Sequence, residues 1–338
     1  MGPSLVAWYL PRARPLPWRT TRDPYRIWVS EIILQQTRVA QGLGYYERFL
    51  ARFPSLEALA SAPLNAVLKA WEGLGYYTRA RNLHATAQHI HHTLGGQWPT
   101  TTAGLEALKG IGPYTARALA SICFGERVAV LDGNVFRVLS RLYADPVPIN
   151  SPSARAHYQP LADGLLEDPG LVPAELNQAL MELGATLCTP RTPGCTTCPW
   201  QPHCAAFASG APSRYPVKQP KPERGNRFYE YYLVVGPQGT VRLRQRDASS
   251  YWKGLWELPA EEVPTWRPNP PQGRERFRLT HEFSHFRLHI RVNEVPEQTW
   301  VASPDERTVG PNDLEGYALS RAVQKVLAQH WADTRTLF

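Results

Sequence analysis

The sequence has 338 residues and a formal net charge of +8, and 43% of its residues are hydrophobic and 11% aromatic. This composition excludes wholesale disorder, and the length allows two domains that each bury a core. No uncharged stretch is long enough to cross a bilayer, and the first residues lack the apolar core of a secretion signal. We therefore expect a cytoplasmic protein without a membrane partner, and the basic balance favours a polyanionic partner.

The chain up to residue 208 is predicted to be helical. Asp23 and Pro24 form a start signal, because Asp is a favoured N-cap and Pro suits the first helical position. The segment that follows, YRIWVSEIILQQTRVA, has apolar residues nearly all round and predicts one deeply buried helix. Further helices are predicted at residues 42–51, 56–60, 64–72, 77–94, 102–108, 113–124, 134–143, 153–167 and 173–187. Since almost no strand pattern precedes residue 228, residues 1–208 are predicted to form an all-α domain.

Two carboxylates stand out within this region. Glu31 is flanked by apolar residues on both sides, in the run IWVSEIIL. Burial disfavours the charged form of a carboxyl group, so the pKa of Glu31 should rise and the side chain could act as a general acid. Asp132 follows an extended run and precedes a predicted helix, where an N-cap is the simplest interpretation. The helix dipole keeps a carboxylate ionised at such a position, which also suits a catalytic role.

Between these carboxylates lies the segment LKGIGPYTA, at residues 108–116. It predicts a helix-hairpin-helix over about residues 102–124, with Gly110 and Gly112 in the turn and Pro113 opening the second helix. The glycines let backbone amides converge at a helix N-terminus, which forms a site for a phosphate or its bridging cation. In a basic chain this motif indicates binding to the DNA backbone.

Four of the five cysteines have the spacing C-x6-C-x2-C-x5-C, at Cys188, Cys195, Cys198 and Cys204. Four thiolates can close a shell around zinc or around an iron–sulfur cluster, and the spacing alone does not choose between them. The prolines and the glycine between these cysteines suit a tight loop wrapped around a ligand. The sequence therefore predicts a metal site in the loop 188–204.

After the cysteine loop the amino-acid composition changes, and this change predicts a linker followed by a second domain. Residues 211–228 are rich in proline and hold five basic residues and one acidic residue. They predict a linker over residues 209–227 that is either a solvated tether or a segment that follows DNA phosphates. Beyond it, residues 229–235 and 240–246 predict a β-hairpin, residues 286–292 alternate as a half-buried strand, and residues 318–330 predict a closing helix. Residues 228–338 are therefore predicted to form an α+β domain.

Together these motifs resemble the helix-hairpin-helix DNA glycosylases of the endonuclease III type. The resemblance rests on LKGIGPYTA, on VLDGNVFRVLSR and on the four-cysteine spacing. The segments WVSEIILQQTRVAQGLGYYERFLARFP and WEGLGYYTRARNLH narrow it to the adenine glycosylases of the MutY type. It runs almost continuously through residues 14–207. In the C-terminal domain, YYLVVGPQGTVRLRQRDASSYWKGLWELP resembles the Nudix fold.

The resemblance implies a base excision repair enzyme that hydrolyses the N-glycosidic bond of adenine mispaired with 8-oxoguanine or guanine in double-stranded DNA. It implies that the adenine is flipped out of the helix, that Glu31 protonates its N7, and that Asp132 stabilises or captures the oxocarbenium ion at C1′. Tyr114 and Asn134 match residues that support this pair. Tyr114 also stands where bifunctional relatives have a Schiff-base lysine, so we expect a monofunctional glycosylase.

The resemblance also implies a cofactor and DNA contacts. It favours a [4Fe–4S] cluster over zinc at the four cysteines, with a structural and DNA-positioning role. Positions that enter the DNA stack around the lesion are matched by Gln35, Gln36, Leu74 and Tyr76. The loop that reads 8-oxoguanine is matched by Phe283, Ser284 and His285, although the pattern of these residues by itself is that of a polar β-turn. We expect a monomer associated with a bacterial nucleoid.

Three alternatives stand beside this interpretation. A thymine glycosylase acting on G·T mismatches shares the N-terminal motifs, but the long second domain argues against it. A non-enzymatic iron–sulfur DNA-binding protein would leave Glu31 in its apolar helix unexplained. A Nudix hydrolase is disfavoured because the acidic box R-E-x-x-E-E is missing, and Glu257, Glu261 and Glu262 do not reproduce its spacing.

Overall fold

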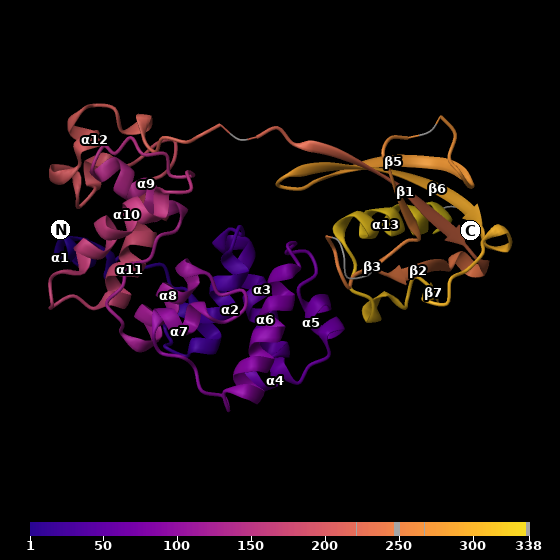
Figure 1. Ribbon diagram of the computed structural model, residues 1–338, viewed down its shortest axis with the longest axis horizontal. Coiled ribbons are helices and arrows are strands. Elements are labelled where there is room, and N and C mark those ends of the chain that lie inside the picture. Colours follow the sequence, from indigo (N-terminus) through magenta and orange to yellow (C-terminus); the bar gives the residue numbers. More distant parts are fainter. Residues whose placement is uncertain (221, 247–250, 267, 336–338) are drawn as a thin grey trace. The chain divides into compact units, whose positions relative to one another are not determined.

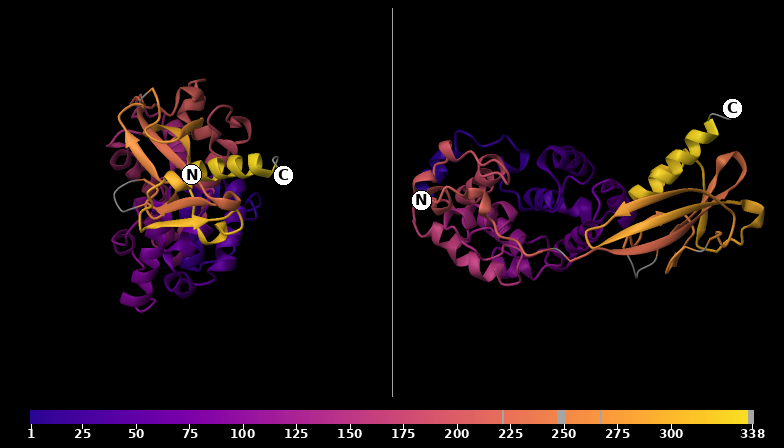
Figure 2. Two further views of the ribbon diagram at one scale, coloured as in Figure 1. Left: turned by 90° about the vertical axis from the view of Figure 1, so that its right-hand side faces the viewer. Right: turned by 90° about the horizontal axis from the view of Figure 1, so that it is seen from above.

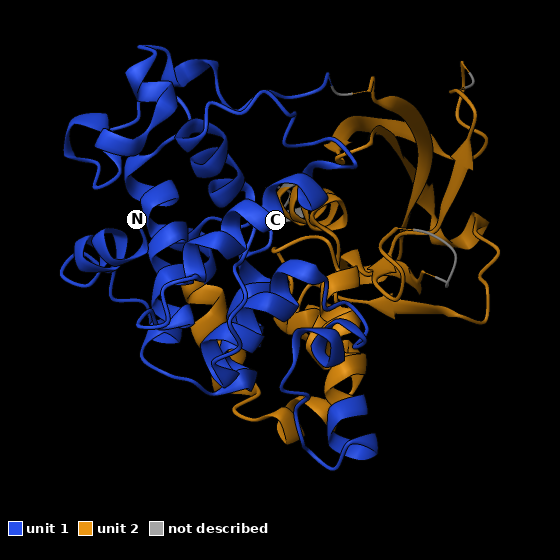
Figure 3. Ribbon diagram, turned by 60° about the vertical axis from the view of Figure 1, so that its left-hand side comes forward, with its two compact units in different colours: residues 1–42, 89–221 blue, residues 43–88, 222–338 orange. Residues whose placement is uncertain are grey.

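The computed structural model describes residues 1–220, 222–246, 251–266 and 268–335. They form two compact units, one of residues 1–42 and 89–221 and the other of residues 43–88 and 222–338 (Figure 3). The second unit thus joins a helical segment from the first part of the chain to the C-terminal domain. The division predicted from the sequence, into residues 1–208, 209–227 and 228–338, follows chain order and stays a prediction.

The region before residue 221 is built from helices, and its described residues contain no strand. The helices are α1 Gly2–Tyr9, α2 Pro24–Leu34, α3 Val39–Arg52, α4 Leu56–Ala60, α5 Leu64–Ala70, α6 Thr78–Gln88, α7 Thr102–Glu106, α8 Pro113–Phe124, α9 Gly133–Leu142, α10 Ala154–Asp163, α11 Pro173–Glu182 and α12 Ala205–Ala208 (Figure 1). Both α6 and α11 continue into a π-helical turn, at His89–Thr93 and Leu183–Leu187. The predicted all-α fold of this region is confirmed.

Helix α2 begins where the sequence predicts it. The Asp23 carboxylate accepts a hydrogen bond from the backbone N–H of Tyr25 at 2.9 Å, and Pro24 occupies the first turn. The predicted continuation of this helix through residue 40 is wrong. The chain leaves α2 at Leu34, Gln36 adopts a positive φ of 59°, and α3 starts at Val39. A positive φ is incompatible with a right-handed helix, so the two glutamines lie in a turn between two helices.

The C-terminal domain is a mixed sheet with one long helix. Its strands are β1 Gly225–Val235, β2 Val241–Gln245, β3 Trp256–Glu257, β4 Ala260–Val263, β5 Arg274–Glu282, β6 Phe286–Pro296 and β7 Glu306–Val309. Within the described residues the strand order is β3-β2-β1-β6-β5, with β4 paired to β1 and β7 paired to β2. Strands β1 and β6 run parallel, whereas β5 and β6 form an antiparallel hairpin. The predicted α+β class is confirmed.

Helix α13, Arg321–Arg335, lies across one face of this sheet (Figure 2). It buries a stripe of apolar side chains against the inward faces of β1 and β6, where Leu233, Leu288 and Ile290 are fully buried. The stripe has helical spacing and consists of Ala322, Val323, Val326 and Leu327. This packing closes the core of the C-terminal domain. None of the helices that the structure describes is long and apolar enough to span a membrane.

Candidate active site

A cavity of about 850 Å³ opens among the helices of the first unit. Its size is typical of a ligand site. The four residues predicted to be catalytic all line it, together with the two glutamines of the turn after α2: Glu31, Tyr114, Asp132, Asn134, Gln35 and Gln36. The fold therefore brings together residues that are up to about a hundred positions apart in the sequence. The Gln35 side chain also reaches the Thr115 hydroxyl, 3.5 Å away.

Glu31 is a buried carboxyl group on α2, and only 8% of its surface is exposed. The pKa of Glu31 is raised to about 7, because burial and the nearby charge of Asp132 raise it more than a hydrogen bond from Tyr114 lowers it. The group can therefore hold a proton close to neutral pH, as a general acid requires. The expectation drawn from its apolar neighbours in the sequence agrees with this environment.

Asp132 is the N-cap of α9. One carboxylate oxygen accepts the backbone N–H of Val135 at 2.7 Å, and the other accepts the side-chain amide of Asn134 at 2.8 Å. Burial raises the pKa of Asp132, but these hydrogen bonds and the charge of Arg137 oppose the rise. Glu31 accepts one such hydrogen bond and Asp132 accepts several. We therefore infer that Asp132 loses its proton at a lower pH than Glu31, so that Glu31 is still protonated when Asp132 is ionised.

A chain of hydrogen bonds leads from Asp132 to the cysteine loop. Asn134 accepts a hydrogen bond from the Arg137 guanidinium at 2.9 Å, and the same guanidinium donates to the carbonyl oxygens of Cys188 at 2.9 Å and Gly184 at 2.7 Å. Arg137 is 9% exposed, so these bonds are shielded from water. The position of Asn134 thus depends on the backbone that precedes and begins the cysteine loop.

Tyr114 lies in the first turn of α8. Its hydroxyl is 3.2 Å from the Met181 sulfur and within hydrogen-bonding reach of Glu31. Burial and the two neighbouring carboxylates raise its pKa well above the ordinary value, so the phenol stays protonated. In the described part of the chain the lining of the cavity contains no lysine.

Sequence reasoning missed a buried ion-pair cluster beside the cavity. Arg14 and Arg19 line the cavity, and each donates to the Glu182 carboxylate at 2.7 Å. Glu182 is 1% exposed, and burial would raise its pKa, but the hydrogen bonds from the two arginines outweigh burial and lower it. A signal was present, because Glu182 stands between Met181 and Leu183 much as Glu31 stands between apolar neighbours.

The predicted helix-hairpin-helix consists of α7, a turn, and α8. Gly110 adopts a φ of +79°, a conformation that residues with a side chain rarely adopt, and Gly112 is the N-cap of α8. Ile111 between them is 3% exposed and fixes the turn to the core. The first amides of α8 have no partner inside their own helix, as at any helix N-terminus, and the anion site at this point stays a prediction.

The other predicted DNA-stack residues lie in the second unit, in the turn between α5 and α6. Gly73, Gly75 and Tyr76 have positive φ angles of 93°, 71° and 47°. Tyr76 is 51% exposed, whereas Leu74 is only 8% exposed. The Arg79 guanidinium lies over the Tyr76 ring, 5.6 Å from its centroid, and donates to the carbonyl oxygens of Leu74 and Gly75. The hydrogen bonds from Arg79 therefore fix the backbone of the turn, while the Tyr76 ring is exposed.

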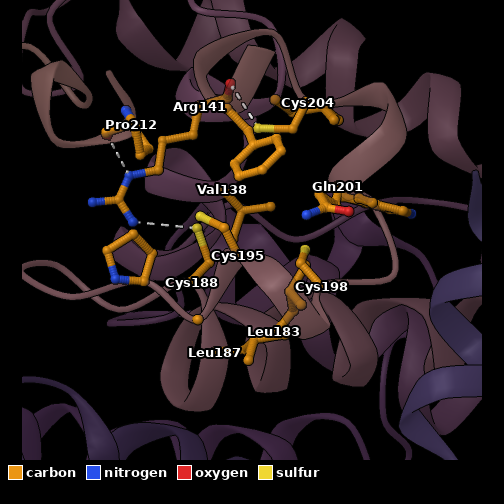
Figure 4. A pocket seen from close by; sticks show the side chains of 15 residues that line it. Val138, Arg141, Leu183, Leu187, Cys188, Cys195, Cys198, Gln201, Cys204 and Pro212 are labelled. Carbon is orange, nitrogen blue, oxygen red and sulfur yellow. Dashed lines mark hydrogen bonds between the residues drawn. The ribbon is translucent and has the colours of Figure 1, made fainter. Parts of the chain in front are cut away.

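The four cysteines surround one hollow in the first unit (Figure 4). None of the four forms a disulfide. The pKa of Cys198 is raised to about 11, because burial and the nearby sulfurs of the other three outweigh a hydrogen bond from the Trp200 backbone. The Arg141 guanidinium donates to the Cys188 sulfur at 3.3 Å, and the Cys204 thiol lies 3.4 Å from the Arg141 carbonyl oxygen. The loop and α9 are therefore joined through Arg141.

The four thiols are a donor set that fits either zinc or a [4Fe–4S] cluster. Within the described ranges, no group of three or more His, Cys, Asp or Glu side chains is arranged to hold a metal ion.

The predicted recognition residues form the turn between β5 and β6. Ser284 and His285 are exposed, and their side chains lie 3.2 Å apart. Phe283 instead stacks on Phe286, with ring centroids 4.3 Å apart, and packs against Tyr251. Phe283 thus anchors the turn, and the two polar side chains point outward.

The glutamates that fail the Nudix spacing have other partners. Glu257 pairs with Arg246 at 2.5 Å, Glu262 pairs with Arg227 at 2.6 Å, and Glu261 accepts the Tyr232 hydroxyl at 3.3 Å. Three carboxylates held by three different partners do not form a magnesium site.

Comparison with known proteins identifies the family. Residues 29–155 match the HhH-GPD superfamily of base excision DNA repair proteins, and residues 230–329 match the NUDIX domain. The chain is 34% identical to the adenine DNA glycosylase of Mus musculus, over 97% of this chain and 77% of that protein. It is 38% identical to the adenine DNA glycosylase of Schizosaccharomyces pombe, over 92% of this chain and 85% of that protein.

The chain belongs to the adenine DNA glycosylase family.

Among solved structures, a thermostable thymine-DNA glycosylase is similar to this chain. The likeness covers 62% of this chain and 95% of the glycosylase chain, with a TM-score of 0.56 and 28% identity. Endonuclease III, in a non-covalent complex with DNA, has a similar fold. The likeness covers 62% of this chain and 94% of the endonuclease chain, with a TM-score of 0.50 and 18% identity. Each of these likenesses covers 62% of this chain, whereas the two adenine DNA glycosylases match 97% and 92% of it. The thymine-specific and non-enzymatic alternatives are therefore not favoured, and the chain is a DNA glycosylase that acts on adenine.

Proposed function

We propose that this glycosylase excises adenine paired with 8-oxoguanine, and more slowly adenine paired with guanine, from duplex DNA after flipping the adenine into the cavity of the first unit. The observation that carries the proposal is the pairing of Glu31, with a pKa raised to about 7, and the hydrogen-bonded carboxylate of Asp132 in one cavity. One protonated and one ionised carboxyl group are what cleavage of a glycosidic bond requires. A flipped base is the substrate that such an enclosed site can reach.

In the proposed reaction Glu31 donates its proton to N7 of the adenine. The C1′–N9 bond then breaks, and its electron pair stays with the purine, which leaves as neutral adenine. The Asp132 carboxylate stabilises the positive charge that develops on the sugar. Water adds at C1′ and gives a proton to the Glu31 carboxylate, which restores the acid and leaves an abasic site. Arg14 and Arg19, fixed by Glu182, offer hydrogen-bond donors to the ring nitrogens of the bound base.

We infer a monofunctional enzyme. Strand cleavage by the bifunctional route needs an amine that forms a Schiff base with C1′. Tyr114 occupies the matching position, and its raised pKa keeps it a neutral hydrogen-bond donor toward Glu31. Borohydride should therefore trap no enzyme–DNA adduct, and efficient trapping that persists after Tyr114→Phe would contradict this part of the proposal.

Cys188, Cys195, Cys198 and Cys204 would hold a [4Fe–4S] cluster. Its contribution when bound is structural, since it would fix the loop 188–204 for contact with DNA. The helix-hairpin-helix amides would bind backbone phosphates, and Tyr76 with Gln35 and Gln36 would enter the stack at the lesion. Ser284 and His285 would hydrogen-bond the edge of 8-oxoguanine. These contacts separate backbone positioning from base reading.

The decisive experiment is base release under single-turnover conditions from four duplexes that differ only in one pair: A·8-oxoG, A·G, T·G and 8-oxoG·C. We expect release of adenine from the first at the highest rate, slower release from the second, and none from the other two. Release of thymine, or equal rates for A·8-oxoG and A·G, would refute the proposed substrate. The product from the A·8-oxoG and A·G duplexes should be an abasic site in an uncut strand.

A further inference from the structure

Residue Leu319 joins the C-terminal domain to the turn at residues 73–76. Its backbone N–H donates to the Glu72 carboxylate at 2.9 Å, and its carbonyl oxygen accepts the Tyr77 hydroxyl at 2.9 Å. Glu72 immediately precedes the turn and Tyr77 immediately follows it. Both ends of the turn are therefore hydrogen-bonded to the two peptide groups of a single residue, and all of these residues belong to the second unit.

Further bonds extend this contact. The Lys69 ammonium pairs with Glu72 at 2.9 Å and donates to the carbonyl oxygens of Leu314 at 3.0 Å and Tyr317 at 3.2 Å. The Asn65 side-chain amide donates to the Gly316 carbonyl oxygen at 2.7 Å. We name this set the 319 clamp; its members are Asn65, Lys69, Glu72, Tyr77 and the backbone of residues 314–319.

The clamp is rigid on both sides. The Leu319 side chain is 1% exposed within the core beneath the sheet, and α13 starts two residues later. Tyr77 is 5% exposed and Glu72 17% exposed, so the bonds are largely shielded from solvent. On the turn side, Gly73 leaves no room for a side chain, because a Cβ atom there would lie 2.3 Å from the Tyr45 hydroxyl. A displacement of the sheet domain would therefore pull directly on the turn.

We propose that the 319 clamp makes adenine excision depend on the opposite base, by fixing the C-terminal domain to the turn that carries Tyr76. This inference rests on the proposed function, in which Tyr76 enters the stack and the turn of Ser284 reads 8-oxoguanine. A fixed connection between the two DNA-contacting elements lets a base read by the C-terminal domain influence the opening of the adenine. Lys69, Glu72 and Tyr77 are thus positioning residues for specificity that do not touch the substrate.

The test compares wild type with the variants Tyr77→Phe, Lys69→Met and their double mutant. Each substitution keeps the apolar part of the side chain and removes its hydrogen bonds to residues 314–319. Glu47→Gln, on the exposed face of α3, serves as a control for changes at the surface. Single-turnover excision is measured with enzyme in excess over DNA, on A·8-oxoG and on A·G duplexes. The rate on A·8-oxoG divided by the rate on A·G should be about tenfold smaller in the double mutant than in wild type. A tenfold change corresponds to about 1.4 kcal/mol, which is the size expected for the lost hydrogen bonds. Excision from A·G should stay within about twofold of wild type.

Amide hydrogen exchange reports whether the clamp has opened. The Leu319 amide should exchange faster in Glu72→Ala and in the double mutant than in wild type or Glu47→Gln. If the amide is deprotected and the rate ratio is unchanged, the inference is wrong. It is also wrong if both duplexes slow equally, since that would indicate a purely structural role. A wild-type enzyme with no preference for A·8-oxoG would instead refute the proposed function itself, which is a separate result.

Discussion

Glu31 and Glu182 are two buried glutamates beside one cavity, and their pKa values shift in opposite directions. Burial dominates at Glu31, where a single phenol donates and a second carboxylate lies nearby. At Glu182 burial is outweighed by hydrogen bonds from Arg14 and Arg19. The same side chain is thus prepared as an acid at one position and as a fixed anion at the other, because its donors differ.

The activity should follow the protonation of Glu31. Since its pKa is about 7, the acid form is lost above that pH, and the single-turnover excision rate should fall about tenfold per pH unit on the alkaline side. Glu31→Gln should abolish excision while leaving DNA binding intact. The measurement is a pH profile at saturating enzyme, with gel-shift affinity as the control. A rate that is flat from about pH 6 to about pH 9 would exclude Glu31 as the acid.

The raised pKa also has a cost in stability. The folded protein keeps the Glu31 proton up to about pH 7, whereas the ordinary value is 4.5, so the free energy of unfolding should fall as the pH rises between these values. The loss approaches about 3 kcal/mol above pH 7. Glu31→Gln removes this titration and should be more stable than wild type at about pH 8, with a smaller gain at about pH 4. Urea denaturation at both values measures the difference, and equal gains would contradict the shift.

At the scale of elements, the close approach of α9 to the π-helical turn after α11 positions Asn134. A Cβ atom on Gly184 would lie 2.6 Å from the Asn134 Cβ and 3.2 Å from its backbone. The same Gly184 carbonyl accepts a hydrogen bond from Arg137. A side chain here would therefore push the N-terminus of α9, and with it Asp132, away from the cavity.

Gly184→Ala should lower the excision rate by at least about tenfold, because displacements of about 1 Å at a catalytic group have effects of this size. Gly164→Ala is a matched control, since its nearest neighbour is a Glu167 oxygen 3.8 Å away and its φ is −59°. Both variants are compared by single-turnover kinetics and thermal unfolding. Equal rates in the two variants would show that Asn134 tolerates the shift.

Arg141 connects α9 to the cysteine loop and is 2% exposed. Its guanidinium also donates to the carbonyl oxygens of Thr189 at 2.7 Å, Pro190 at 3.0 Å and Pro212 at 3.0 Å. Arg141→Met removes the hydrogen bonds to these acceptors, so we expect the purified variant to hold less than about half of the iron of wild type, which should hold about four per chain. Arg191→Met, at an exposed position of the same loop, should keep it. Equal iron and sulfide contents would refute this role.

The sequence predicted those parts of the site whose surroundings are local. Glu31 stands in an unbroken run of buried residues on α2, and Asp132 caps the helix that follows it, so both positions can be inferred from a few adjacent residues. The anchor of Glu182 depends on arginines 163 and 168 positions away, and the bond from Leu319 to Glu72 spans 247 positions. Hydrophobic periodicity carries no information about such pairs. The end of α2 was missed because the positive φ of Gln36 has no pattern of its own.

At the scale of the molecule, the excess charge lies in the helical region and in the segment after it. Residues 211–228 hold five basic residues and one acidic residue, and residues 229–338 are balanced. Arg214 and Lys218 are exposed. If these side chains contact DNA phosphates, the double variant Arg214→Gln, Lys218→Gln should bind every duplex more weakly by the same factor. The slope of log K against the logarithm of the salt concentration should become less steep by about 2. Fluorescence anisotropy at several salt concentrations tests this, and an unchanged slope identifies the segment as a solvated tether.

The last helix has a consequence for the making of the protein. Because α13 covers the apolar face of the sheet, a chain that lacks this helix exposes Leu288, Ile290 and Val292 to water. Such a chain is a target for chaperones and an aggregation hazard. A premature stop codon shortly before Arg321 should therefore remove the protein from the cell by degradation, even though every residue of the excision cavity would have been translated.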